Sequence, residues 1–305
     1  MCSSDLKRMT TIAMIAMLLG AGAAFFPASQ AAAQEKVAEG APTAEALGWR
    51  VGCQAYTFNR FTFYEAVDKT ASLGLHWIEA YPGQRLSPDM PEDVKFDHNM
   101  PAELQKTVLD KLASANVKLV NYGVVGLPNN EDEARKVFEF AKAMGIETIC
   151  SEPPKAAFDL IEKLADEYEI NVAIHNHPKP SVYWNPDRVL EVIEGRSKRL
   201  GACADTGHWM RSGIDPLEAI KKLEGRIISF HFKDLNDMDP RAHDVPWGTG
   251  KANVKALLEE IHRQGFKGVF SAEYEHNWEN SLPDLAECVT NFEKFAREIA
   301  AAAQQ

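Results

Sequence analysis

Cysteine and positive charge are both scarce in this chain. The sequence has 5 cysteines in 305 residues and a formal net charge of −11 at pH 7. No two cysteines have the spacing of a zinc knuckle, which excludes a cysteine-based zinc module. A surface of this charge repels a phosphate backbone, which argues against a nucleic acid as partner. We expect Cys53, Cys150, Cys203 and Cys288 to be free thiols, with a disulfide as the alternative in an exported protein.

One apolar run opens the chain, and no low-complexity tract follows it. Lys7 and Arg8 precede this run, which covers residues 12–26, and Ala31 to Ala33 supply small residues for cleavage. This order predicts a secretory signal peptide over residues 1–33 and export to the periplasm or the cell exterior. The run is short and rich in alanine and glycine, so we expect no membrane span in the mature chain. A retained N-terminal anchor is the alternative.

Eight apolar β-type runs alternate with amphipathic helical stretches after a polar leader at residues 34–48. The runs occupy residues 49–56, 76–81, 117–124, 148–152, 171–176, 200–205, 227–233 and 269–275. Eight strand-then-helix units in one domain-sized segment predict the α/β class and a single (β/α)₈ TIM barrel over residues 49–305, rather than an open doubly wound sheet. Residues 81–99 are rich in proline, aspartate and glycine, which indicates a long loop over the barrel mouth.

Four potential metal ligands stand at the ends of four consecutive expected strands: His175, Asp205, His231 and Glu273. They are 30, 26 and 42 residues apart, as successive strand-loop-helix units require. Two imidazoles and two carboxylates at the mouth of a parallel barrel predict a site for one divalent cation. We expect Mn²⁺ or Zn²⁺, with Fe²⁺ or Co²⁺ as alternatives.

Side chains two positions apart on a strand point the same way. His177, Lys233 and Glu275 should therefore face the cavity together with the ligands, whereas Phe230 and Phe232 should face the surrounding helices.

Several motifs resemble one known group of proteins. They are AIHNH at the fifth strand, ADTGH followed by GIDPLEAI, RIISFHFKD, the loop HDVPWGTG and FSAEYE at the eighth strand. This set resembles the sugar phosphate isomerase/epimerase superfamily, whose members have a xylose isomerase-like barrel. The resemblance implies that His175, Asp205, His231 and Glu273 bind the cation. It also implies that the cation polarises a sugar carbonyl, so that a neighbouring carbon can lose a proton.

One departure from the group bears on the mechanism. Many of its sugar epimerases have a glutamate at the strand-five position, where it pairs with the strand-eight glutamate as a second base. This chain has His175 there, and a metal-bound imidazole is a poor base. We therefore expect one-base isomerisation, or proton abstraction followed by β-elimination or hydration at a keto-sugar. Glu273 is the leading candidate base, and Glu152 is either a second base or a helix cap.

Other residues have a functional and a structural interpretation. His208 binds a substrate hydroxyl or orients a ligand, and Lys233 stabilises an enolate or forms an ion pair. The residues expected to line the sugar pocket are Glu79, Tyr81, His177, Trp209, His243, Trp247 and Glu275. For the two tryptophans, core packing is the alternative. No arginine cluster accompanies the loop after the seventh strand, which favours a non-phosphorylated sugar.

The sequence thus predicts a metal-dependent sugar isomerase or epimerase that binds a small-molecule sugar. A lyase or hydratase of 3-keto-glycosides is the first alternative. An abasic-site endonuclease, to whose metal cluster Asp205, His208, His231 and His243 bear some likeness, and a non-catalytic sugar-binding protein are the others. The sugar, the metal and a homo-oligomeric state stay open.

Overall fold

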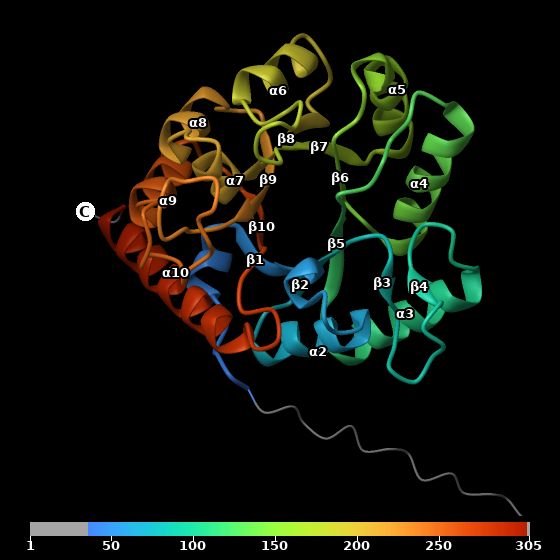
Figure 1. The fold of residues 1–305 in the computed structure, drawn as a ribbon, viewed down its shortest axis with the longest axis horizontal. Helices are drawn as coiled ribbons and strands as arrows, with labels where there is room; N and C mark the ends of the chain where they lie inside the picture. The colour runs from blue at the N-terminus through green and yellow to red at the C-terminus, as the bar shows by residue number, and fades with distance from the viewer. Residues whose placement is uncertain (1–35, 304–305) are drawn as a thin grey trace, which may run out of the picture. The chain divides into compact units, whose positions relative to one another are not determined.

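A closed barrel of eight parallel strands forms the centre of the protein in the computed structural model, which describes residues 36–303. The expected signal peptide lies outside these residues. The barrel strands run in the order β1-β10-β9-β8-β7-β6-β5-β2 (Figure 1). Their bounds are β1 Trp49–Gln54, β2 Trp77–Ala80, β5 Lys118–Tyr122, β6 Thr148–Ser151, β7 Asn171–His175, β8 Leu200–Asp205, β9 Ile227–Phe232 and β10 Gly268–Ala272. The predicted TIM barrel is confirmed.

Helices surround the barrel as an outer ring (Figure 1). Their bounds are α1 Pro42–Ala46, α2 Phe63–Ser72, α3 Ala102–Ser114, α4 Glu131–Met144, α5 Phe158–Tyr168, α6 Pro186–Ile193, α7 Thr206–Arg211, α8 Pro216–Lys222, α9 Val254–Arg263 and α10 Leu282–Ala302, with 3₁₀ turns η1 Ala55–Phe58 and η2 Lys155–Ala157. Within the described part of the chain, no helix has the length and apolar character needed to cross a membrane.

Two elements differ from the sequence prediction. The segment expected as a plain loop, residues 81–99, contains a short antiparallel pair, β3 (Gln84–Arg85) and β4 (Lys95–Phe96). Strands of two residues give no period that a sequence pattern can reveal. Helix α7, which the sequence pattern did not indicate, begins directly at the end of β8, because Asp205 caps it by accepting a hydrogen bond from the His208 backbone N–H at 2.6 Å.

Local chemistry explains where the outer helices begin and end. Asp215 caps α8 by accepting a hydrogen bond from the Leu217 N–H at 2.8 Å, and Pro216 occupies the first helical position. Helix α4 ends at Gly145, whose φ of 71° is left-handed and suits glycine.

The main core lies between the barrel and the helices. Phe230 and Phe270 stack with ring centroids 4.8 Å apart, and Phe232 packs edge-on against Phe292 of α10 at 5.8 Å. The outward orientation predicted for Phe230 and Phe232 follows from the two-residue period of a strand. The four cysteines of the described region, Cys53, Cys150, Cys203 and Cys288, are buried free thiols, as expected.

Candidate functional site

The polar side chains predicted at strand ends meet at one end of the barrel. His175 and Asp205 are the last residues of β7 and β8, His231 lies opposite Asp205 in the register of β9, and Glu273 directly follows β10. Parallel barrel strands all end on the same face. The four side chains therefore converge, and none of these residues is more than 7% exposed.

Four residues place a ligand atom within 4.8 Å of one another: His175, Asp205, His208 and Glu273. The sequence prediction has His231 in place of His208. His231 borders the same group, because its Nδ1 lies 3.0 Å from Glu273 Oε2. The fold thus brings the four predicted ligands together and adds His208 from α7.

Hydrogen bonds decide which nitrogen of each ligand imidazole is free. His175 Nδ1 donates to Glu152 Oε1 at 3.1 Å, and His231 Nε2 donates to Glu79 Oε1 at 2.9 Å. Carboxylates only accept, so these nitrogens carry the protons. Within the described residues, His175 Nε2 and His231 Nδ1 are buried without a hydrogen-bond partner. A carboxylate behind each ligating histidine is the usual arrangement at metal sites.

These free nitrogens fit a divalent cation. His175 Nε2 lies 3.6 Å from Asp205 Oδ2, and His231 Nδ1 lies beside Glu273. Two imidazole lone pairs and two carboxylates suit Mn²⁺, Zn²⁺, Fe²⁺ or Co²⁺. His208 differs, because its Nδ1 lies 3.1 Å from Arg211 Nη1, which is always a donor, so the ring proton is on Nε2. Its position suits substrate contact better than ligation.

The charge of the two carboxylates is balanced by Lys233. Its fully buried Nζ donates to Asp205 Oδ2 at 2.6 Å and to Glu273 Oε2 at 2.5 Å. Burial opposes the charged form, but these two carboxylates hold the pKa of Lys233 well above its usual value. Burial also opposes ionisation of Asp205 and Glu273, yet the Lys233 ammonium keeps the pKa of both carboxyls low. Lys233 therefore holds both carboxylates in place.

The surroundings of His175 and His208 shift the pKa values of these two imidazoles in opposite directions. Burial disfavours the charged form of His175, but the nearby carboxylates of Asp205 and Glu152 raise its pKa to about 9. A cation at Nε2 would take the place of the proton there, since ligands must be deprotonated. Burial and nearby Lys233 lower the pKa of His208 well below its usual value, against the effect of Asp205. His208 is thus neutral near pH 7.

Both carboxylate oxygens of Glu152 accept hydrogen bonds from neighbouring residues. Its Oε1 accepts from His175 Nδ1, from the His177 N–H at 2.8 Å and from His177 Nδ1 at 2.6 Å, and its Oε2 accepts from Ser181 at 2.7 Å. Burial would raise its pKa, but the bonds with His175 and His177 hold the pKa far below its usual range. It does not cap the following turn, where Pro154 stands at the cap without a side-chain hydrogen bond. The geometry gives Glu152 the task of orienting two histidines.

Arg211 belongs to the site but was missed by the sequence reasoning. From α7 it contacts His208, Glu275 and Asp244, the last at 2.8 Å, and its Nε donates to the Ala242 carbonyl at 3.1 Å. Its position three residues after His208 places both on one face of a helix. The three-residue spacing between His208 and Arg211 is the feature of the sequence that could have identified Arg211 as a site residue.

The remaining predicted pocket residues occupy different surroundings. Trp209 and Trp247 are each 1% exposed, and Trp247 packs on Phe232 and Phe292 in the barrel–helix layer, so the core interpretation applies to it. Glu79 is fully buried beneath His231. His243 is exposed and packs on His276.

An aromatic group lies on the loops that follow β1, β2 and β10. Tyr56, 39% exposed, packs edge-on against Tyr81 and Trp278, with ring centroids 5.2 and 5.7 Å apart. Of the predicted aromatic residues, Tyr81 thus presents a more accessible face than Trp209 and Trp247.

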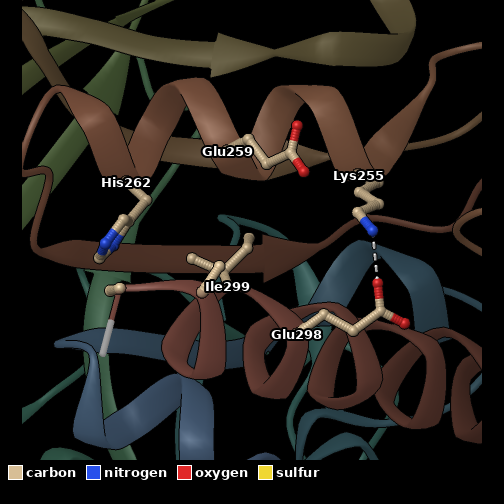
Figure 2. Close-up of a pocket in the computed structure, with 7 residues that line it drawn as sticks. Lys255, Glu259, His262, Glu298 and Ile299 are labelled. Carbon is tan, nitrogen blue, oxygen red and sulfur yellow. Dashed lines mark hydrogen bonds and ion pairs between the residues drawn. The ribbon is translucent and has the colours of Figure 1, made fainter. Parts of the chain in front are cut away.

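A separate hollow lies on the outer surface between α9 and α10 (Figure 2). Lys255, Glu259, His262 and Glu298 line it, and Lys255 Nζ pairs with Glu298 Oε2 at 2.6 Å. These groups belong to the helical layer and not to the strand ends, so the strand-end cluster remains the candidate site.

A sequence comparison shows the family to which the chain belongs. Residues 67–292 match the family described as Xylose isomerase-like TIM barrel. The rhizopine catabolism protein MocC of Rhizobium meliloti is 27% identical over 160 residues, which cover 47% of this chain and 48% of that protein. An inosose dehydratase of Lacticaseibacillus casei is 27% identical over 138 residues, covering 38% and 45%. The chain thus spans less than half the length of these curated relatives.

Two solved structures extend the comparison. An uncharacterized protein from Parabacteroides distasonis is 34% identical, with a TM-score of 0.67 over 81% of this chain and 99% of that one. A structure of the IOLI protein with a bound zinc atom is 17% identical, with a TM-score of 0.60 over 83% and 98%. The second likeness concerns the fold alone.

Proposed function

Because this chain belongs to the xylose isomerase-like TIM barrel family, we propose that it dehydrates a non-phosphorylated keto-sugar or cyclic keto-polyol with the help of a divalent cation. One observation carries the choice of elimination over epimerisation. At the strand-five position the site has His175, held by Glu152 with its free Nε2 towards Asp205. A two-base epimerase needs a free base on each face of the substrate. At the strand-five position this chain has His175 instead, whose free nitrogen we assign to the cation.

The residues of the site have separate roles in the proposed reaction. His175, Asp205, His231 and Glu273 hold the cation. When bound, it supplies a Lewis acid that polarises the substrate carbonyl and acidifies the neighbouring C–H bond. Lys233 fixes the positions of the two carboxylates through its hydrogen bonds of 2.6 and 2.5 Å. A base then takes the proton, and the resulting enolate expels the hydroxyl on the next carbon as water.

The loop after β9 supports a substrate without a phosphate. Barrels often bind phosphate there through backbone N–H groups. In this chain the N–H groups of Gly248, Gly250 and Ala252 all donate to the Asp234 carboxylate, each at 2.9 Å. These donors are already satisfied by an internal anion, so a phosphate would have to displace Asp234.

The endonuclease alternative is disfavoured by Arg211. A metal cluster that used His208 together with His243 would need a free nitrogen of each ring to face one cation. His208 Nδ1 instead accepts from Arg211, and His243 is exposed and packs on His276.

Proton NMR in heavy water tests the proposal. Two preparations are used: protein loaded with Zn²⁺ for the NMR spectra and protein loaded with Mn²⁺ for measurements of sugar binding. Each is incubated with an inosose, a 3-keto-glycoside, a ketose and an aldose. We expect deuterium at the carbon next to the carbonyl and loss of one water from a keto substrate, both abolished by a chelator and by Asp205→Asn. An epimer formed without loss of water would replace the dehydratase by an epimerase. Binding of a sugar without deuterium exchange in any of the four compounds would favour a sugar-binding protein.

A further inference from the structure

Two imidazoles lie side by side next to the cation ligands. His177, in the loop after β7, and His208, on α7, have ring centroids 5.4 Å apart and ring planes 29° from parallel. Both flank the ligand His175, at 4.4 and 5.7 Å between centroids. Neither is required to hold the cation, so the site has two further rings beside the place where the substrate carbonyl must lie.

The charged partner of His177 determines its protonated nitrogen. His177 Nδ1 lies 2.6 Å from Glu152 Oε1, and the same oxygen accepts the His177 backbone N–H. A carboxylate without a proton cannot donate, so Nδ1 carries the ring proton and Nε2 has a free lone pair. The side chain is half-exposed, at 49%.

The partner of His208 has the opposite effect. A guanidinium has donors and no acceptor, so Arg211 Nη1, 3.1 Å from His208 Nδ1, requires a lone pair on that nitrogen. The proton is then on Nε2, which lies 3.6 Å from Asp205 Oδ2. Arg211 is itself held by Asp244, Glu275 and the Ala242 carbonyl. The neutral His208 ring is thereby fixed as a donor towards the cluster.

Glu273 is a less suitable base than His177. Its Oε2 accepts from Lys233 at 2.5 Å. This hydrogen bond and its place among the proposed cation ligands commit its electron pairs. The imidazole of His177 has no such commitment at Nε2, and Glu152 stabilises the imidazolium that forms when the ring takes up a proton, as a buried carboxylate does in a catalytic triad.

We propose that His177 is the base of the dehydration and that His208 is a neutral hydrogen-bond donor to the substrate oxygen, with Arg211 as the positioning residue that fixes the His208 tautomer. This inference rests on the proposed function. His177 Nε2 takes the proton from the carbon next to the carbonyl, and the C–H electron pair forms the enolate. His208 Nε2–H donates to the enolate oxygen throughout and keeps its proton. The enolate electrons then form the C=C bond, the neighbouring C–O bond breaks, and the His177 imidazolium returns its proton to the departing hydroxyl as water.

The tautomers are tested first, without any substrate. Two-bond ¹H–¹⁵N spectra of histidine-labelled protein distinguish a ring protonated at Nδ1 from one protonated at Nε2, and His177→Gln and His208→Gln assign the signals. We expect Nδ1–H for His177 and Nε2–H for His208. Arg211→Met should convert His208 to a mixture of its two tautomers and leave the tautomer of His177 unchanged. The matched control Arg135→Met, which removes an arginine bonded to Glu131 and Glu167 on the outer helices, should change neither ring. The same tautomer on both rings overturns the inference.

Kinetics then separate the two roles. His177→Gln should lower proton exchange and dehydration by the same factor, about 10² to 10⁴, as expected for loss of a positioned base. His208→Phe removes one oxyanion donor and should lower kcat by about 10² to 10³. Arg211→Lys, which keeps the positive charge and one donor, should retain more of kcat than Arg211→Met, with KM little changed in both. Full exchange in His177→Gln overturns the inference while leaving the dehydratase standing. A wild-type protein with the expected tautomers but without exchange would instead overturn the proposed function and, with it, these roles.

Discussion

Lys233 offers the sharpest test of how the site is held together. Its buried ammonium donates to Asp205 at 2.6 Å and to Glu273 at 2.5 Å, and lies 3.4 Å from Glu275. Lys233→Met keeps a similar length of apolar side chain but removes the charge. Asp205, which is fully buried, and Glu273, which is 7% exposed, then lose the ammonium that donates to both of them. Removal of one partner of a buried ion pair costs about 3–5 kcal/mol.

That cost should be visible in thermal unfolding of the chelated protein. In a domain of this size, 1 kcal/mol shifts Tm by about 2–4 °C, so we expect Lys233→Met to lower Tm by about 10 °C. Saturating Mn²⁺ should recover more of Tm in the variant than in the wild type, because the cation replaces the lost positive charge. Lys163→Met is the matched control. Lys163 is 57% exposed and pairs with Glu131 on the surface, so the change should cost well under about 1 kcal/mol.

The pH dependence adds an independent check. The pKa values of Asp205 and Glu273 are depressed in the folded protein by the Lys233 ammonium acting against burial. Their contribution to wild-type stability is present above the unfolded-state pKa, about 4, and is lost as pH falls towards the folded-state values. The deficit of Lys233→Met should therefore be largest near neutral pH and shrink on acidification. A variant as stable as the wild type in chelator at pH 7 would refute the ion-pair argument.

Three further predictions concern the ligands and the N-terminus. Glu152→Gln should weaken cation binding about 10- to 100-fold by isothermal titration, since it orients His175, and should also lower kcat at saturating cation, since Glu152 holds the proton of His177 on Nδ1 and stabilises its imidazolium; an unchanged kcat at saturation would contradict that second role. Glu273→Gln should lose both cation and turnover; retention of both would contradict its place in the site. Export predicts that protein recovered from cells begins near Gln34, by N-terminal sequencing, whereas an intact Met1 and activity confined to the cytoplasm would rule out cleavage of residues 1–33.

The amino-acid sequence alone predicted the barrel and the convergence of the four strand-end side chains that we propose as cation ligands. Strand and helix periods are local properties, and parallel strands of a closed barrel must end on one face. His175, Asp205, His231 and Glu273 were therefore predictable as neighbours, although they lie up to 98 residues apart. The short β3–β4 pair and helix α7 were missed, because each depends on a few residues held by contacts with the rest of the fold.

Only the tertiary structure decided what each side chain does in the site. The free nitrogen of His175 depends on Glu152, 23 residues away, and that of His231 depends on Glu79, 152 residues away. Trp247 is buried against Phe292 rather than open to a sugar. A strand period indicates the direction in which a side chain leaves the backbone, but its rotamer, its proton and its burial are set by partners that are distant in sequence and close only in the folded chain.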